Sequence, residues 1–328
     1  MKNVICRTID FMKADRFLSM LFLFVLINAC NSHKTEKKIE EPQPATKDSI
    51  IAVEKLPSIE KEFDTVNVKP AEESVLLKFN FQKGKTYNYT MSFDVSQKRG
   101  DQSRGSRMKW NYDMQVIDEK AGLKTLKITY KRIDMAMNMG GDQKMEFSSE
   151  KEIDAMDFMQ LPSRMFKIVK DKSFFMQVNE KGEVVSVTGF DKIGEAVVSE
   201  AGLPEEMKPM LRQNFQQRFN DDAVKQMFSQ SFEIFPNKPV KIGDSWKRSS
   251  NIMKQNISTV YTVKNIKGSR VFLTGASKIK SDDGKSSGTQ TSKLIIDSRT
   301  GLMIDGAFDQ KSDDASMITK SRIVGKEL

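Results

Sequence analysis

Apolar and polar side chains alternate along most of the chain after residue 74. A period of two residues is typical of antiparallel strands with one buried face. The first run places Leu77, Phe79 and Phe81 on one face, and longer runs follow through short turns. The sequence therefore predicts a mainly β protein of the α+β class, built on a broad curved sheet or half-barrel.

The alternating pattern occurs twice in the chain. In each copy a glycine, a hydroxyl residue and an aromatic residue open a strand, and two turns at corresponding places also match. The matching segments are 84–87 with 243–246, 116–122 with 263–268, and 178–182 with 296–301. We therefore predict two diverged antiparallel β-meander halves, residues 74–189 and 233–328. The alternative is a resemblance that any two hairpins would show.

Residues 190–232 have a different period, of about 3.6 residues, which indicates helices. Met207, Met210 and Phe215 fall at helical spacing, and Asn220 can cap a second helix. We predict a helical insert between the two halves. Its apolar side needs a partner, and the dry face of the sheet is the available surface.

An apolar run at residues 17–27 follows two basic residues near the start of the chain. It is too short to cross a bilayer as a helix, and its order of charged, apolar and small residues is that of a secretory signal. Residues 26–30 resemble a bacterial lipobox, in which the cysteine receives a diacylglyceryl group. We expect residues 1–29 to be a signal peptide and Cys30 to carry lipid, with palmitate among its acyl chains. A plain cleaved signal and a retained anchor helix are the alternatives.

Residues 30–73 are rich in Lys, Glu and Pro without a sustained apolar period. Such a segment cannot bury enough surface to fold, so we predict a disordered charged tether. The net charge of the chain is +9, and the tether is acidic, so the remainder is basic. A basic body favours anionic neighbours such as lipid head groups. A diffusely charged surface without a specific patch is the alternative.

The residue types of most catalytic and metal sites are scarce. The chain has one His and two Cys, and cleavage would leave only His33 and Cys30, both before the predicted sheet. Residues 284–288 match Gly-x-Ser-x-Gly, but no histidine in the body could act as their base. Three alternating methionines at 135–139 could bind Cu(I). The chain has 20 Met, however, which indicates general packing. We expect no catalytic residue, no metal and no cofactor.

The lipobox, the acidic tether and the two-copy β domain together resemble uncharacterised envelope lipoproteins of Gram-negative bacteria, a family of unknown function. In architecture alone, the predicted sheet with helices on one face is similar to the half-barrel of periplasmic lipoprotein carriers. The resemblance implies a lipid-anchored protein of the cell envelope, at the outer membrane and facing the periplasm. It implies no functional residue and no nucleic-acid partner.

These observations favour a non-enzymatic protein that binds an apolar ligand between sheet and helices. The ligand would be an acyl chain, a lipid, including an anionic one, or a lipidated client. The predicted lining residues are Tyr89, Met91, Trp110, Met137, Met207, Met210 and Phe215. The alternative is a structural or interaction lipoprotein with a filled core that docks an envelope partner.

Overall fold

The computed structural model describes residues 59–64, 74–99, 102–138, 144–152, 158–218, 220–236, 238–252 and 254–328. The predicted signal peptide, Cys30, most of the predicted tether and Met139 lie outside these residues.

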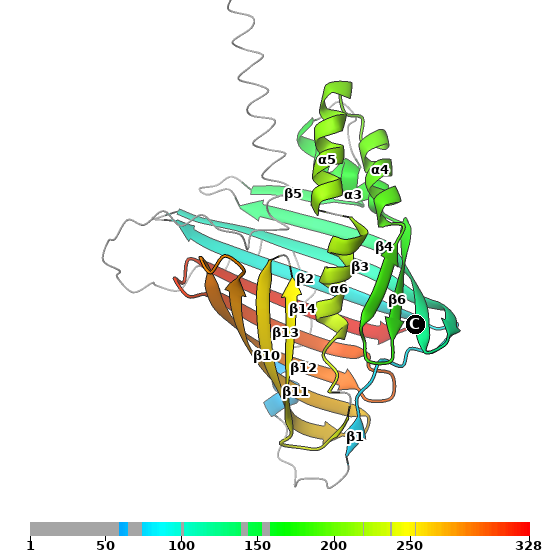
Figure 1. Ribbon diagram of the computed structural model, residues 1–328. Coiled ribbons are helices and arrows are strands. Elements are labelled where there is room, and N and C mark those ends of the chain that lie inside the picture. Colours follow the sequence, from blue (N-terminus) through cyan, green and yellow to red (C-terminus); the bar gives the residue numbers. More distant parts are fainter. Residues whose placement is uncertain are drawn as a thin grey trace, which may run out of the picture. The chain divides into compact units, whose positions relative to one another are not determined.

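One large antiparallel sheet dominates the described part of the chain (Figure 1). Its first half contains β2 (Thr86–Arg99), β3 (Gln102–Lys120), β4 (Leu123–Asn138), β5 (Lys144–Ser148), β6 (Ser173–Asn179) and β7 (Val184–Thr188). Its second half contains β9 (Ser245–Ile252), β10 (Gln255–Lys267), β11 (Arg270–Ser281), β12 (Ser287–Asp297), β13 (Met303–Ser312) and β14 (Met317–Glu327). The strand order is β7-β6-β4-β3-β2-β14-β13-β12-β11-β10-β9, and β5 pairs with β4. The sheet is curved and not closed, which confirms the predicted fold class.

The two halves meet where β2 pairs with β14, the first and last long strands of the sheet. Lys85 and Glu327 form an ion pair of 3.0 Å beside this junction. Strands β7 and β9 are therefore the two free edges.

The halves repeat the same hydrogen bonds at their first turns. Gly84 N donates to Val116 O at 2.9 Å in the first half, and Gly243 N donates to Val263 O at 2.9 Å in the second. Both glycines have a positive φ, which residues with a side chain rarely adopt. Gly84 corresponds to Gly243, and Val116 to Val263, in the match between the two halves that the sequence predicts.

The chain before β2 covers one end of the sheet. Strand β1 (Val75–Leu76) pairs with β8 (Pro239–Val240). After it, Phe79 N donates to Glu180 O at 2.9 Å and Asn80 N donates to Thr300 O at 2.8 Å, so this segment joins corresponding turns of both halves. Phe79 and Phe81 are fully buried. This end of the core is filled.

Two helical elements lie within the first half, between β5 and β6: η1 (Phe158–Gln160) and α3 (Leu161–Val169). Those that lie between the halves are α4 (Phe190–Glu200), η2 (Glu205–Met207), α5 (Lys208–Arg218) and α6 (Asp221–Phe232). Helix α6 contacts both edge strands, β7 and β9, and the sheet curves around it (Figure 1). Helices α3, α4 and α5 lie together near β5.

Residues 59–64, which the sequence analysis places in the tether, form the short helix α2 (Ile59–Asp64). Ile59 is buried, and the ring of Phe63 lies 5.4 Å from that of Phe272 on β11, edge to face. Glu62 pairs with Arg270 at 3.0 Å. Two apolar residues one helical turn apart are enough to dock this helix on the sheet because Phe272 and Ile295 form an apolar patch there.

Candidate functional site

Two neighbouring rows of side chains cross the concave face of the sheet, each made of residues that are paired from strand to strand. The Tyr261 row is Trp246, Tyr261, Gly275, Ser292, Phe308, Ser321, Phe93, Met108 and Met135. The Arg248 row is Arg248, Thr259, Ser277, Gln290, Gln310, Thr319, Val95, Ser106 and Met137. Residues two apart in a strand share a face, so both rows face the same side.

The Arg248 row changes chemistry where the halves meet. Its six members in the second half are all polar, whereas two of its three members in the first half, Val95 and Met137, are apolar and the third is Ser106. Thr259 and Ser277 are buried and their hydroxyl oxygens lie 2.8 Å apart in a hydrogen bond. Polar side chains on the inner face of a curved sheet cost stability unless they are paired. Thr259 and Ser277 meet this requirement with each other, so the second half presents polar groups on its inner face.

Gly275 and Ser292, the two small residues next to Tyr261 in its row, leave space for the Tyr261 ring. A Cβ atom on Gly275 would overlap the hydroxyl of Ser292 and would lie 3.1 Å from the Tyr261 ring, so the ring occupies the space that a side chain would take. The Ser292 hydroxyl is buried and makes no hydrogen bond within the described part of the chain.

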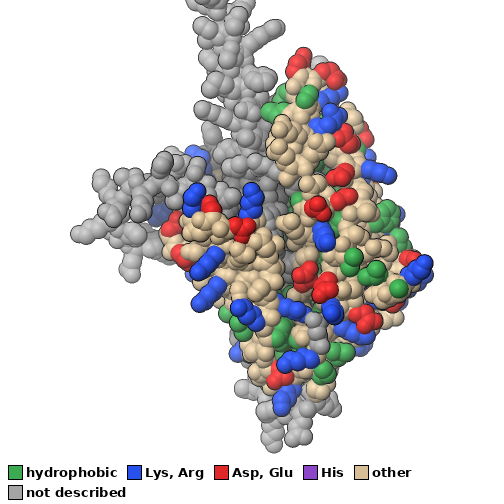
Figure 2. Space-filling model, viewed as in Figure 1, with side chains coloured by type: hydrophobic (Ala, Val, Ile, Leu, Met, Phe, Trp, Pro, Cys, Tyr) green, Lys and Arg blue, Asp and Glu red, His purple; other side chains and the backbone are tan. Residues whose placement is uncertain are grey.

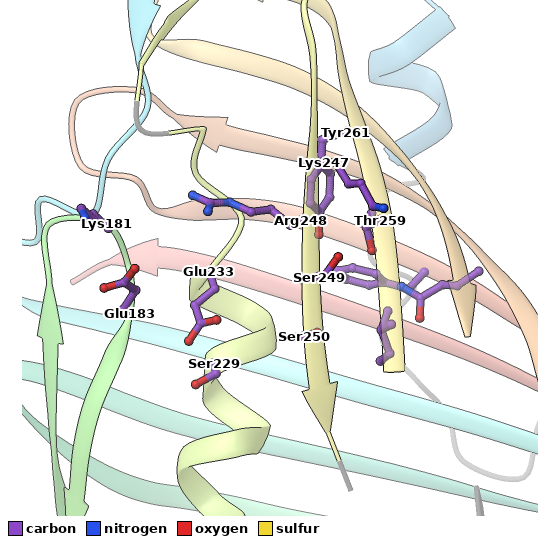
Figure 3. A pocket seen from close by; sticks show the side chains of 13 residues that line it. Lys181, Glu183, Ser229, Glu233, Lys247, Arg248, Ser249, Ser250, Thr259 and Tyr261 are labelled. Atoms are coloured by element: carbon purple, nitrogen blue, oxygen red, sulfur yellow. The ribbon is translucent and has the colours of Figure 1, made fainter. Parts of the chain in front are cut away.

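A cavity of about 160 Å³ lies between these rows, α6 and the turn that joins β6 to β7 (Figure 3). Strand β9 contributes Lys247, Arg248, Ser249 and Ser250, and β10 contributes Ile257, Thr259 and Tyr261. Ser229 and Glu233 come from the end of α6, Lys181 and Glu183 from the turn, and Gln290 and Phe308 from β12 and β13. The cavity is therefore lined by both charged and apolar groups.

Arg248 is the most constrained cation of this cavity. It extends from β9 toward the side on which Lys181 lies (Figure 3), and its Nη2 donates to the carbonyl oxygen of Phe235. Its Nε is buried and has no hydrogen-bond partner among the described residues. No described carboxylate pairs with it, although Glu233 lines the same cavity. A guanidinium in this state has a donor available for an anion.

Tyr261 lies beside this guanidinium as a neutral hydroxyl. Burial raises the pKa of Tyr261 to about 12, while the hydrogen bond with Thr259 and the charge of Arg248 act in the opposite direction. At neutral pH the phenol therefore keeps its proton and can donate it to an acceptor in the cavity.

The apolar part of the inner face continues from the filled core toward the other end of β2 and β3. Tyr89 is buried in the core, whereas Met91 and Trp110 are half-buried and pack against it. The hydroxyl of Tyr112 lies 3.0 Å from the sulfur of Met91, and the rings of Phe93 and Trp110 are 5.3 Å apart. Half-buried aromatic and methionine side chains on a concave face form an adaptable apolar surface.

The structure does not bring the seven predicted lining residues together. Tyr89, Met91, Trp110 and Met137 are on the inner face of the sheet, and Met137 is buried beside Met145 of β5. Met207, Met210 and Phe215 belong to η2 and α5, which pack on each other, and α5 also packs on α4. A Cβ atom on Gly194 of α4 would lie 3.1 Å from the Phe215 ring.

Helix α6, the second helix of the predicted insert, lies against the sheet, and α4 also contacts β6, whereas the predicted lining residues of the insert are on η2 and α5. Phe228 of α6 is buried, 5.9 Å from the ring of Tyr112 and 5.8 Å from that of Phe174. Helices α5 and α6 both have apolar side chains at helical spacing, and Gly194 gives α5 a close fit against α4 instead.

Arg248 and the other polar residues of its row are not among the site residues predicted from the sequence. The sequence does indicate that these residues face inward. Arg248 and Ser250 lie two and four residues after Trp246 in one strand, and Thr259 lies two residues before Tyr261 in the next, so each shares a face with the aromatic residue. A search for apolar alternation passes over a strand in which polar residues occupy the inner positions.

The outer surface gives no comparable concentration of charge on the side shown in Figure 2, where acidic and basic side chains are interspersed. Across the described residues, His, Cys, Asp and Glu form no group of three that could hold a metal ion. In the same part of the chain, no helix is both long and apolar enough to cross a membrane.

Comparison with known proteins gives a family without an assigned activity. The profile of DUF6263, a family of unknown function, matches residues 121–303. No curated protein matches the chain. A solved structure titled "Lipid-protein interactions in lipovitellin" is similar at 12% identity and a TM-score of 0.45, over 76% of this chain and 25% of that one. A DUF1329 family protein from Desulfovibrio piger shows 10% identity and a TM-score of 0.13, over 75% and 85% of the two chains. The chain thus spans about a quarter of the length of the lipovitellin chain.

Proposed function

This chain belongs to DUF6263, a family of unknown function, and we propose that it is a non-enzymatic binding protein for amphipathic lipids or lipidated clients. The ligand lies on the concave face of the sheet, with its acyl chain on the apolar half and its polar end toward the second half. The observation that supports this most directly is the change along the Arg248 row from six polar side chains in the second half to mainly apolar ones in the first.

The apolar half offers the acyl chain a surface that is not used up by the core. Met91 and Trp110 are half-buried, whereas Tyr87 and Met114, nearer the filled end, are completely buried. Burying apolar area contributes about 25 cal/mol per Å², so this surface gains free energy when a hydrocarbon chain covers it. The competing function, a filled core that only supports an outer docking surface, leaves these half-buried side chains unexplained.

We also propose that the protein works from a lipid anchor in the cell envelope, at the outer membrane and facing the periplasm. The lipobox-like sequence that ends in Cys30 supports the anchor. A protein anchored in the membrane would be close to the bilayer that contains its lipid ligands. Its direct partners would then be the bilayer and whatever lipid or lipidated protein it takes up.

The test is to extract the purified full-length protein and identify bound lipids by mass spectrometry. We expect acyl lipids at a defined stoichiometry, and a reduced amount with Phe93→Asn. The matched control is Phe175→Asn, because Phe175 is exposed on the other face of β6. Lipid-free protein that also fails to take up a fluorescent fatty acid would favour the filled-core alternative.

A further inference from the structure

The cavity beside Arg248 has the chemistry of a receptor for an anion. Its guanidinium is held at one nitrogen by the carbonyl oxygen of Phe235, and the buried Nε is left without a partner. The hydroxyls of Thr259, Ser250 and Tyr261 line the same space, and Lys181 and Lys247 add positive charge at its border. An unpaired buried donor costs free energy, which a bound anion would recover.

The position of this cavity relates it to the apolar surface. Ile257 and Phe308 line it together with Arg248. From Phe308 the Tyr261 row continues through Ser321 to Phe93 on β2, so one line of paired residues connects the cavity with the apolar half. A ligand that extends along this line places a charged end and a hydrocarbon end in matching surroundings.

We propose that Arg248 binds the anionic head group of the ligand, a carboxylate or a phosphate attached to an acyl chain. This inference rests on the proposed function and adds the charge of the ligand to it. The guanidinium provides the positive charge and N–H donors for the head group, and the neighbouring hydroxyls can donate to its other oxygens. Glu183 and Glu233 at the rim disfavour an anion that is not drawn in by its apolar chain.

The test compares two fluorescent probes that differ only in charge, cis-parinaric acid and its methyl ester, on the purified full chain. The wild type should bind the acid about ten- to a hundredfold more tightly than the ester, the range that a charge-assisted hydrogen bond supplies. In Arg248→Gln this preference should disappear while the affinity for the ester stays the same. Arg248→Lys keeps the charge without the planar fork of donors, so it should retain part of the preference.

Arg107→Gln is the matched control, because Arg107 pairs with Asp94 on the opposite face of β2 and β3 and should not affect either probe. Displacement of the acid by lysophosphatidate at a lower concentration than by a fatty acid of the same chain length would assign the site to a phosphate head group, and the reverse order to a carboxylate. Displacement by inorganic phosphate alone would show a site for a free anion and would overturn the head-group assignment. If Arg248→Gln does not fold, the acid-to-ester ratio in the wild type and in Arg248→Lys decides.

Different results would overturn the role of Arg248 and the proposed function. Equal binding of acid and ester by the wild type would overturn the role of Arg248 and leave lipid binding intact. Failure to bind either probe would overturn the proposed function itself.

Discussion

The indole N–H of Trp246 donates a hydrogen bond of 2.8 Å to the carbonyl oxygen of Ile234, which lies just beyond the end of α6. On the other edge of the sheet, Lys225 of α6 donates to the carbonyl oxygen of Val185 at 2.9 Å. Helix α6 is thus fastened to both β9 and β7. Edge strands expose unpaired backbone groups with which other chains can pair, and Lys225 of α6 bonds to one of these groups, the carbonyl oxygen of Val185.

Helix α6 should contribute more to stability than α5. Phe228→Ala removes a buried ring that contacts Tyr112 and Phe174, and should lower the free energy of unfolding by about 3 to 5 kcal/mol. Phe215→Ala, on the less buried α5, should cost less. Urea unfolding followed by circular dichroism measures both. An equal cost would show that α5 and α6 belong to the core alike.

Gly301 should not tolerate a side chain. Its φ is 75°, and a Cβ atom would overlap the carbonyl oxygen of Lys78, so Gly301→Ala must move the segment that covers the filled end. Gly284→Ala is the control, because Gly284 has a φ of 69° but open space around it. The control should cost about 1 to 2 kcal/mol, the strain of the left-handed conformation, and Gly301→Ala distinctly more. Similar melting temperatures for the two variants would contradict this.

Alkaline pH should unfold the protein through its tyrosines. Burial raises the pKa of Tyr89, Tyr112, Tyr130 and Tyr261 above the value of about 10 in an unfolded chain. Below pH 10 the phenols are neutral in both states, so the stability is fully present. Above pH 10 only the unfolded state ionises readily, so stability falls as the pH rises through the folded pKa, which for Tyr261 is about 12.

Near-ultraviolet absorbance and far-ultraviolet circular dichroism, followed together against pH, check this. Tyrosinate should appear in step with the loss of β structure. Gradual ionisation of all five tyrosines while the sheet remains folded would contradict the burial of these rings.

Cys30 should carry the lipid anchor. Radiolabelled palmitate should enter the wild-type protein and not Cys30→Ser, because the thiol is the acceptor of the diacylglyceryl group in a lipobox. The protein should also move from the membrane to the soluble fraction in this variant. Equal labelling of the two proteins would disprove the anchor.

Much of the fold could be predicted because the period of an apolar pattern indicates both the type of element and which of its residues share a face. A period of two residues predicts strands, and the glycines at 84 and 243 mark equivalent turns whatever the rest of the chain does. Helices in 190–232 could be recognised in the same way. Which helix covers the sheet could not, because α5 and α6 both have apolar side chains at helical spacing and only the packing of Phe215 beside Gly194 separates them.

The site was harder to predict for a related reason. Alternation shows which residues share a face, but hydrophobicity is the only clue to which face is inner. Along the Arg248 row this clue is inverted, because the second half places polar residues inside. The register of four strands, β9 to β12, aligns Arg248 with Thr259 and Gln290, and no single strand contains this information.

The pairing of β2 with β14 also means that the sheet cannot be fully formed until β14 has been synthesised. The first long strand lies in the middle of the sheet, yet one of its neighbours, β14, comes after all the other described strands in chain order and is therefore synthesised later than they are. Until then β2 has an open edge, and the first half alone would be prone to pair with other chains. Secretion in an unfolded state would remove this hazard, since folding would begin only when both strands are present in the same compartment.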